Sequence, residues 1–396
     1  METTPFDPTA PLPGPPDPWA STDTPSRRDG PPFHMTEMIA AEPALAERIL
    51  ARHAGADSAA ANLAARIMDA IAAGSPVVFT GCGTSEHGAL AAAEILREAA
   101  GLGSPLVWSA QAFELSLDPP TGGLVIGITH EGATTATNAA LEASRAAGAD
   151  TAVITVTDRS PAATFASVVV GTGELDQSWC HTVGYVSPIV AATAIAGHIA
   201  GARVDGAAAR ALLAGGLTHE ATTAAEALAM RLAGLDRLLV LGSGADRHAG
   251  RELVLKIEEG TWLPAAYRDL ETFLHGHLAA TDRTTGIVVL ASDRRARDAR
   301  AARIRGALAA ANVIGMPTAA IVSPGYDVLL PAATTTAGRI VVAEASEDVP
   351  AAVGALLSTA TALQTLTERL ARVRRVDPDP IHRDVDRYRE AADAAG

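Results

Sequence analysis

The sequence predicts an α/β protein made of two similar domains, each with a central parallel sheet covered by helices on both faces. Apolar runs of about five residues alternate with helical stretches, which is typical of buried parallel strands. The same order of elements starts again near residue 235. A shift of 161 residues superposes Gly81 on Gly242, Gly83 on Gly244, and His87 on His248. The repeat indicates an internal duplication, and 396 residues allow two or three domains of about 100–200 residues.

The first half is expected to begin with a helix over residues 34–71, because its apolar residues recur mostly at helical spacing. A strand at 76–80 leads into a helix at 86–100, which Gly101 and Gly103 end. Further strands are expected at 106–108, 123–128, 151–156 and 167–171, with a helix ending near 147.

A long helical segment at 186–233, interrupted by glycines, connects the two halves. Strands follow at 237–241, 285–290, 319–322 and 339–342. We therefore expect a first domain at 34–220 and a second at 221–373, with a C-terminal tail at 374–396. Residues 1–33 are rich in Pro, Asp and Thr, which predicts a disordered, solvated segment.

Composition narrows the class of protein. Lys and Arg number 31 against 45 Asp and Glu, a net charge of −14, which disfavours nucleic acid and anionic membrane surfaces as partners. Hydrophobic residues make up 48% but aromatics only 4%, so the core must consist of Ala, Val, Leu and Ile. Two distant cysteines favour a reducing compartment without structural zinc. The N-terminus lacks the apolar region of a signal peptide, so we expect a cytoplasmic protein.

Two loops of the first half follow strands and open helices, where ligands bind in open parallel sheets. One contains Gly83, Thr84 and Ser85, and the other runs from Thr129 through His130 and Glu131 to Thr134. Backbone N–H groups and hydroxyls at a helix N-terminus suit an anion such as phosphate, although simple N-capping is the alternative. The loop after residue 81 lacks the third glycine of a dinucleotide-binding motif, so no nucleotide cofactor is expected. In the second half Ala245 and Asp246 replace the hydroxyl pair, so the anion site should belong to the first domain alone.

Lys256 is the only lysine among 31 basic residues. It lies in the segment 255–261 about three turns along the helix after Gly244, with Glu259 close by. Lysine differs from arginine in its compact charge and its tunable pKa, which favours a chemical role for Lys256. The alternative is that Lys256 is an ordinary residue of a charged surface helix and is the only lysine by chance. His275 follows in a glycine-containing segment, where it could act as an acid or base or be a structural histidine. His275 and His277 lack the further ligands that a metal site needs.

The segment 176–182 follows the last strand of the first half. Cys180 and His181 are adjacent in it, which suggests a nucleophile and its base. Adjacent side chains rarely face each other, so packing of the loop is the favoured interpretation.

Together these motifs resemble the sugar isomerase (SIS) domain proteins. The layout is similar to the tandem-SIS isomerase half of glutamine–fructose-6-phosphate aminotransferase and to related phosphosugar isomerases and deaminases, over roughly residues 34–379. Residues 81–85 resemble the first phosphate loop, and 128–134 take the place of the I-S-x-S-G-x-T motif. Residues 255–261 with His275-Gly276 resemble the L-K-x-K-E-x-S … K-H-G stretch, although Leu274 replaces the lysine before its histidine.

The resemblance implies a role for each of three residues. Glu259 would be the base that moves a proton between C1 and C2 of an open-chain sugar. Lys256 would be a cation near the enediol, and His275 would promote ring opening in the active site of a neighbouring subunit. It further implies a homodimer with active sites at the subunit interface, a sugar phosphate or amino sugar as substrate, and aldose–ketose isomerisation with or without deamination. No cofactor is implied.

Two departures from the family pattern bear on the substrate. Glu131 stands where the family has a serine, and a carboxylate repels a phosphate dianion. The tail also lacks the family's C-terminal lysine, for which His382 or Arg383 could substitute. A glutaminase domain is absent from the sequence. A sugar-phosphate sensor of the same fold, without catalysis, is therefore the alternative to an enzyme.

Overall fold

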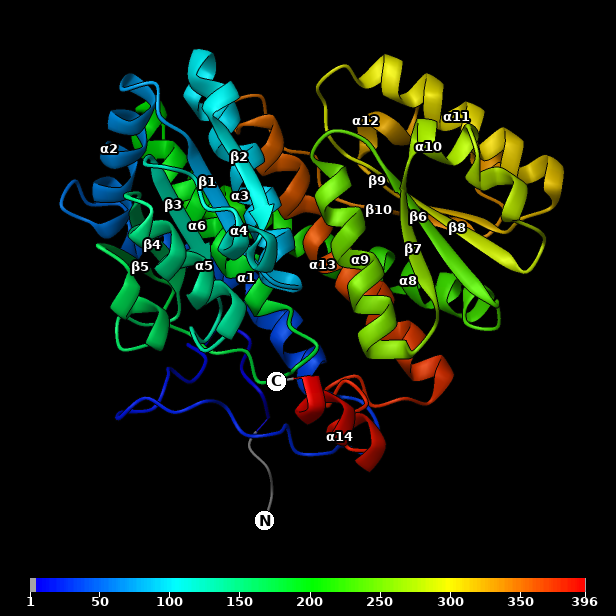
Figure 1. Cartoon of the computed structure of the whole chain (residues 1–396). Helices are drawn as coiled ribbons and strands as arrows, with labels where there is room; N and C mark the ends of the chain where they lie inside the picture. Colours follow the sequence, from blue (N-terminus) through cyan, green and yellow to red (C-terminus); the bar gives the residue numbers. More distant parts are fainter. Residues whose placement is uncertain (1–4, 396) are drawn as a thin grey trace.

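The computed structural model describes residues 5–395 and contains two five-stranded sheets in which all strands are parallel (Figure 1). The first has the order β2-β1-β3-β4-β5. Its strands are β1 (Val77–Gly81), β2 (Val107–Gln111), β3 (Leu124–Ile128), β4 (Asp150–Thr155) and β5 (Val168–Gly171). The second has the order β10-β9-β8-β6-β7. Its strands are β6 (Arg237–Gly242), β7 (Ala265–Asp269), β8 (Thr285–Ala291), β9 (Thr318–Val322) and β10 (Gly338–Val341).

The two sheets have the same strand order when β6 is matched with β1, β7 with β2, and so on to β10 with β5. Within each sheet the first strand pairs with the next two along the chain, and the remaining strands add outward on one side. This confirms the predicted α/β class and the duplication. The sequence did not reveal β7, whose residues are only partly buried and include Arg and Asp.

Helices cover both faces of the sheets, and two of the predicted helical stretches are subdivided. The helix expected at 34–71 is two helices, α1 (His34–Arg52) and α2 (Ala59–Ala72), separated by a turn at Gly55. The stretch expected at 186–233 is three helices, α6 (Val183–Ala200), α7 (Gly206–Ala214) and α8 (His219–Leu232). The domain boundary expected after residue 220 falls in the first turn of α8.

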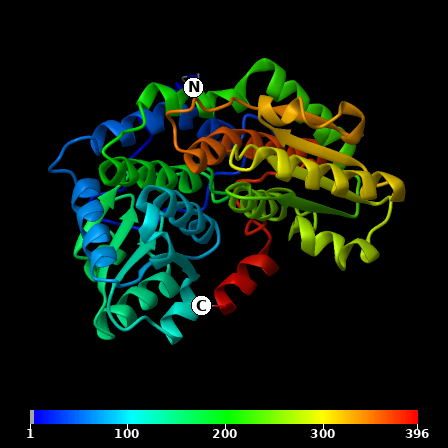
Figure 2. The same ribbon diagram turned by 90° about the horizontal axis from the view of Figure 1, so that it is seen from above.

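The remaining helices complete the two domains. They are α3 (Thr84–Ala100), α4 (Ala112–Leu117), α5 (Thr135–Ala146), α9 (Asp246–Thr261), α10 (Leu270–Leu274), α11 (Arg297–Ile314), α12 (Pro324–Asp327), α13 (Ala351–Arg374) and α14 (Asp386–Ala395). Five short 3-10 helices lie at Gly101–Leu106, Pro161–Phe165, Gly215–Leu217, His277–Ala280 and Ala332–Thr334. The helix α13 packs against α8 and α9 of its own half and against α1 and α7 of the other half. Seen from above, α13 lies at the junction of the two domains (Figure 2).

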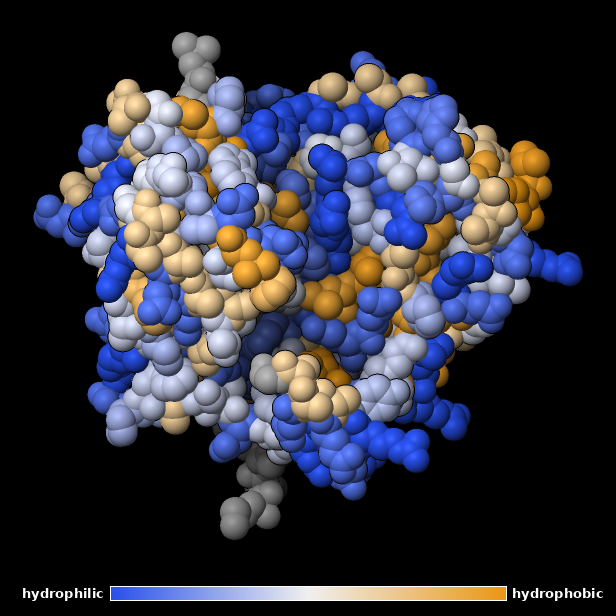
Figure 3. Space-filling view, viewed as in Figure 1, coloured by the Kyte–Doolittle hydropathy of each residue, from blue (hydrophilic) through white to orange (hydrophobic). Residues whose placement is uncertain are grey.

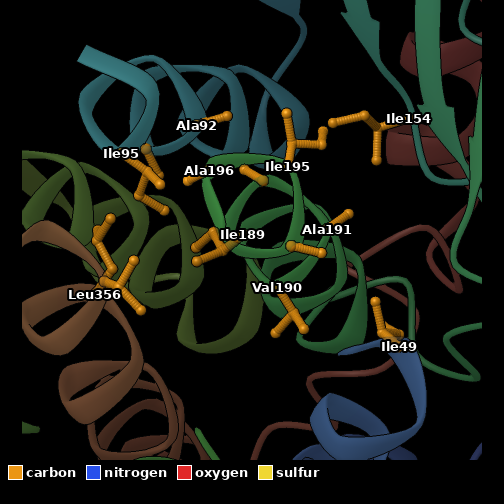
Figure 4. Packing of buried hydrophobic residues seen from close by; sticks show 14 of the residues in the cluster. Ile49, Ala92, Ile95, Ile154, Ile189, Val190, Ala191, Ile195, Ala196 and Leu356 are labelled. Carbon is orange, nitrogen blue, oxygen red and sulfur yellow. The ribbon is translucent and has the colours of Figure 1, made fainter. Parts of the chain in front are cut away.

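The core is built from small aliphatic residues, as the composition predicts. Figure 4 shows Ile189, Val190 and Ile195 of α6 packed among residues of α1, α3, β4 and α13. Among residues 5–395, α6 is the one helix long and apolar enough to cross a membrane, but 83% of it is buried in the protein. It is therefore accounted for as the central helix of the first domain. The numerous alanines let helices approach closely with little loss of side-chain entropy.

The N-terminal segment from residue 5 to 33, expected to be disordered, lies instead against the first domain (Figure 1). Leu12 is buried, and its N–H donates to the Glu174 carboxylate at 2.8 Å. Leu175 N–H donates to the carbonyl of Pro13, also at 2.8 Å. Polar composition predicts disorder only when no partner surface supplies contacts, and here the first domain supplies them. Residues 1–4 of the expected tail lie outside the described residues.

The C-terminal segment after α13 passes beneath the same end of the molecule. The Asp379 carboxylate accepts the N–H groups of His34 and Met35, each at 2.8 Å, and so caps α1. Trp179 N–H donates to the Asp379 carbonyl at 3.0 Å. Arg28 N–H donates to Asp377 at 3.0 Å, which joins the two terminal segments. The tail expected at 374–396 is thus packed as far as α14, which is exposed.

Candidate functional site

A cavity of about 370 Å³ lies at the carboxyl ends of the first sheet, where α9 of the second domain and both terminal segments meet it. Figure 3 shows the surface hollowed between the two halves in this region. The first domain contributes residues 82–85, His130, Glu131, Ala133, Thr134, Trp179 and His181. The second domain contributes Glu259, and the terminal segments contribute Thr22, Ile381 and Arg383.

A larger hollow of about 500 Å³ lies elsewhere, between α1, α6 and α7. Two of its charged residues are already engaged: Glu47 pairs with Arg210 at 2.7 Å, and Arg203 donates to the Ala54 carbonyl. The smaller cavity is therefore the candidate functional site, because ionisable groups from both domains line it.

The first predicted loop presents a helix N-terminus to the cavity. Gly83 has a φ of +57° and directly precedes α3, and no side chain caps this helix. A Cβ on Gly81 would come within 2.6 Å of the Ser85 carbonyl oxygen, so the turn requires glycine there. The Thr84 hydroxyl points to Glu252 at 3.4 Å and is buried, whereas Ser85 is half-buried and lines the cavity. Ser85 is therefore not an N-capping residue of α3, and the N-capping alternative does not explain its place in this loop.

The second predicted loop presents α5 in the same way. Thr134 is the residue before the helix, and its side chain makes no capping hydrogen bond. Thr129 is buried and does not line the cavity, because its hydroxyl accepts the Gly132 N–H at 3.2 Å and holds the turn. His130, Glu131 and Thr134 do line it. Two uncapped helix N-termini with hydroxyls therefore face one cavity, which suits an anion.

In the second domain the corresponding helix N-terminus, that of α9, is already occupied by carboxylates of the same domain. The strand registers align Val78 and Val125 with Leu239 and Ile287, which makes Asp293 the counterpart of Glu131. Asp293 accepts the N–H of Ala245 at 2.8 Å, at the start of α9. That helix N-terminus is satisfied internally, so an anion site of this kind is left to the first domain.

Beneath the cavity a chain of four ionisable groups crosses the domain junction. His87 of α3 contacts Glu252 of α9 at 2.7 Å, and Glu252 lies 3.6 Å from the Lys256 ammonium. Lys256 donates to Glu259 at 2.6 Å. Glu252 and Lys256 are fully buried, whereas a quarter of the Glu259 side chain is exposed. Burial opposes the charge on Lys256, but Glu259 and Glu252 outweigh burial, so the pKa of Lys256 is raised and its charge is held.

Two of the three residues predicted to be catalytic, Glu259 and Lys256, belong to this row of ionisable groups. Glu259 lines the cavity, and Lys256 supports it from below without lining the cavity itself. His275 does not take part: its side chain is 75% exposed, lies 3.1 Å from Glu271, and does not line the cavity.

The loop 176–182 brings a second group of polar side chains to the cavity. Asp176 is buried and accepts the N–H groups of Ser178, Thr182 and Gly184 at 3.0, 2.7 and 3.1 Å. Its carboxylate lies 3.7 Å from Nδ1 of His181. Burial raises the pKa of Asp176, but the nearby His181, the charge of His130 and the Ser178 N–H outweigh burial and hold the pKa below its ordinary value. Asp176 is thus a fixed negative charge behind His181.

Two histidines in this group have opposite pKa shifts. His130 Nε2 accepts the N–H of Asp176 at 2.9 Å, and burial together with the nearby His181 lowers the pKa of His130 to about 4. Burial also disfavours the charged form of His181, but Asp176 outweighs it and raises the pKa of His181. The two rings are 5.4 Å apart. His130 is therefore neutral near pH 7, while His181 gains a proton more readily.

Cys180 supports the packing interpretation of this loop. It is fully buried, and its sulfur lies 4.0 Å from the Lys256 carbonyl. Burial raises the pKa of the thiol well above its ordinary value, which removes the thiolate that a nucleophile needs.

Glu131 is contacted by the N-terminal segment. The backbone N–H of Thr22 donates to it at 3.1 Å, and the Thr22 hydroxyl also donates to it. No cationic side chain within residues 5–395 pairs with Glu131 in the structure. The site therefore carries a carboxylate beside the expected anion loops, held by neutral donors.

Of the two tail residues considered in place of a lysine, Arg383 lines the cavity and His382 does not. The Arg383 guanidinium lies 5.5 Å from the centre of the Trp179 ring. His382 is stacked between Trp262 and Tyr388, with ring centres 3.6 and 3.7 Å away.

Sequence reasoning did not assign Thr22, Trp179 or His181 to the site, although all three line the cavity. Thr22 lies in a segment expected to be disordered, and Trp179 and His181 lie in a loop assigned to packing. The one available signal was that the loop 176–182 follows a strand at its carboxyl end. Within residues 5–395 no cluster of three or more potential metal ligands occurs.

Comparisons with known proteins agree with the fold. Residues 231–316 match the SIS domain. The C-terminal domain of glucosamine-fructose-6-phosphate aminotransferase from Francisella tularensis has a TM-score of 0.74 at 17% identity, covering 89% of this chain and 99% of its own. Tagatose-6-phosphate ketose/aldose isomerase from Escherichia coli has a TM-score of 0.68 at 17% identity, covering 90% and 97%. Glucosamine-6-phosphate deaminase from Thermotoga maritima has a TM-score of 0.62 at 18% identity, covering 87% and 96%. No curated protein matches the sequence.

Proposed function

Because the chain contains a SIS domain and folds as a tandem pair of such domains, we propose that it binds a sugar phosphate or amino-sugar derivative and isomerises it between aldose and ketose forms. The observation that carries the proposal is Glu259. Its carboxylate reaches the cavity beside two uncapped helix N-termini and is supported from below by Lys256 at 2.6 Å.

In this proposal Glu259 takes the proton from the carbon next to the carbonyl and returns it to the adjacent carbon. Such a transfer needs a carboxylate within reach of both carbons and an environment that stabilises the developing enediolate. The buried Lys256 orients Glu259 through their hydrogen bond. The N-termini of α3 and α5, with Ser85 and Thr134, bind the anionic end of the sugar. Deamination coupled to the same proton transfer remains within the proposal, since Glu131 suits an amino group.

The proposal includes a cytoplasmic homodimer. His275 is exposed in the single chain and lies outside the cavity, so a part in ring opening requires that it enters the cavity of a second copy. Its exposure supports this arrangement, since a residue that completes a partner's site must be accessible on the surface of its own subunit.

A sugar-phosphate sensor is the second candidate, because Glu131 lies at the expected phosphate loops. Hydrogen–deuterium exchange distinguishes the two. In D₂O the enzyme should exchange the C1 hydrogen of a ketose phosphate or the C2 hydrogen of an aldose phosphate. Fructose 6-phosphate, tagatose 6-phosphate and glucosamine 6-phosphate are suitable probes.

Glu259→Gln should abolish this exchange, while Glu258→Gln, an exposed carboxylate on the same helix, should leave it unchanged. Binding without exchange in the wild type would assign the protein to the sensor class. Exchange that survives Glu259→Gln would remove Glu259 from the catalytic role.

A further inference from the structure

Isomerisation of a hydroxy aldehyde moves two protons. One passes between carbons, and the other passes between oxygens O1 and O2 of the enediol. Glu259 can serve the first transfer, but while it holds the carbon proton it is no longer a base for the oxygen proton. A second acid–base group in the cavity would serve the transfer between the oxygens, and the proposed function does not name one.

We propose that His181 is this second catalytic residue and carries the proton between O1 and O2, with Asp176 positioning it. The inference rests on the proposed function and deepens it. Lys256 cannot fill the role, because it is fully buried between Glu252 and Glu259 and does not line the cavity. His181 lines the cavity together with Glu259, and its side chain is 29% exposed.

The surroundings of His181 are those of a proton carrier. Asp176 is buried, is fixed by three backbone N–H groups, and lies 3.7 Å from Nδ1. Nδ1 has no hydrogen-bond partner within residues 5–395, so a small rotation of the ring toward Asp176 would form one. A carboxylate behind one imidazole nitrogen orients the ring and stabilises its charged form, which leaves the other nitrogen for the substrate.

His130 is the competing imidazole in the cavity. Its Nε2 is committed as an acceptor of the Asp176 N–H, and its pKa of about 4 keeps it neutral. Two titratable groups whose surroundings move their pKa values apart commonly have different roles in catalysis. His130 can then donate a hydrogen bond from Nδ1 but cannot deliver a proton at neutral pH. The other charged groups that act on His181 are Lys256, which lowers its pKa, and Glu259, which raises it.

The proposed step conserves protons and electrons. Glu259 takes the proton from C2, the C2–H electrons form the C1=C2 bond, and the carbonyl oxygen O1 receives a proton from the His181 imidazolium. The neutral imidazole then takes the proton from the O2 hydroxyl as the C2=O2 bond forms, and C1 takes the proton from Glu259. Both side chains end as they began.

The experiment separates carbon exchange from net isomerisation in one sample. Wild type and His181→Asn are incubated in D₂O with fructose 6-phosphate, tagatose 6-phosphate or glucosamine 6-phosphate, and both rates are followed by NMR. His181→Asn should slow isomerisation about 100-fold or more, the usual contribution of an acid–base group. Carbon exchange should fall much less, because the enediolate can still form and reverse. The ratio of exchange to isomerisation should therefore rise at least about tenfold.

Three variants serve as controls. Glu259→Gln should lose both rates together, and His219→Gln, an exposed histidine at the start of α8, should change neither. Asp176→Asn keeps a hydrogen-bond acceptor and should move the basic limb of the pH profile of kcat/KM to lower pH, because the step starts from the His181 imidazolium and the charge that raises the pKa of His181 is gone.

The outcomes distinguish this inference from the proposed function. If the wild type exchanges no carbon-bound hydrogen with any of the three sugars, the proposed function fails. If the wild type exchanges but His181→Asn leaves the ratio unchanged, only the role of His181 fails. A raised ratio in His130→Gln instead of His181→Asn would also overturn it.

Discussion

Lys256→Met tests whether the charge chain beneath the cavity stabilises the fold. The substitution keeps the volume and removes the charge between Glu252 and Glu259. Removing one partner of a buried ion pair costs about 3–5 kcal/mol, because it leaves an uncompensated buried charge. Here Glu252 keeps His87 at 2.7 Å, and Glu259 is partly exposed and can turn to water. The loss should therefore lie near the lower end, about 3 kcal/mol.

Urea unfolding followed by circular dichroism measures this loss. With a slope of about 2 kcal/mol per molar, the midpoint should fall by about 1.5 M. Arg251→Met is the matched control: it removes a positive charge from the same helix, where Arg251 lies 4.9 Å from the Tyr267 ring, and it should cost about 1 kcal/mol or less. Adding Glu252→Gln to Lys256→Met should restore part of the loss. A midpoint shift for Lys256→Met no larger than that of Arg251→Met would refute the argument.

Three further predictions concern the substrate, the pH and the assembly. Glu131→Ser should raise the affinity for fructose 6-phosphate about tenfold, or about 1.4 kcal/mol, in calorimetry; a weaker affinity would mean that Glu131 contacts a cationic group of the ligand. Burial raises the pKa of Asp246 to about 6, so the folded state holds a proton that the unfolded state releases, and stability falls as pH rises from about 4 to 6. Asp246→Asn should flatten that fall by up to about 3 kcal/mol in urea unfolding, and an unchanged slope would contradict the assignment. If His275 acts in a partner's site, mixing inactive His275→Asn and Glu259→Gln proteins should restore about a quarter of the wild-type activity, since half the dimers are mixed and each has one intact site. A monomer in sedimentation at micromolar concentration, or no restored activity, would refute the shared site.

The fold class and the duplication were predictable because they depend on local patterns. Apolar runs and glycine turns recur with the same order in each half, and parallel strands buried on both faces have a recognisable composition. The strand β7 was missed because its residues are only partly buried, so they show no apolar run. The two predicted loops could be located for the same local reason: a glycine after a strand, followed by hydroxyls, indicates a helix N-terminus whatever the rest of the chain does.

The tertiary structure alone decided which side chains share the cavity. Glu259 and the loops at 83–85 and 129–134 are far apart in sequence, and only the packing of α9 against α3 places them together. The same packing turned Lys256 inward. The pKa of His181 depends on Asp176, which is buried by the fold. Thr22 and Arg383 reach the cavity because the terminal segments that carry them pack against the folded domains. Burial and charge pairing are properties of the folded surroundings, so the sequence could identify candidate groups but could not determine their ionisation or their neighbours.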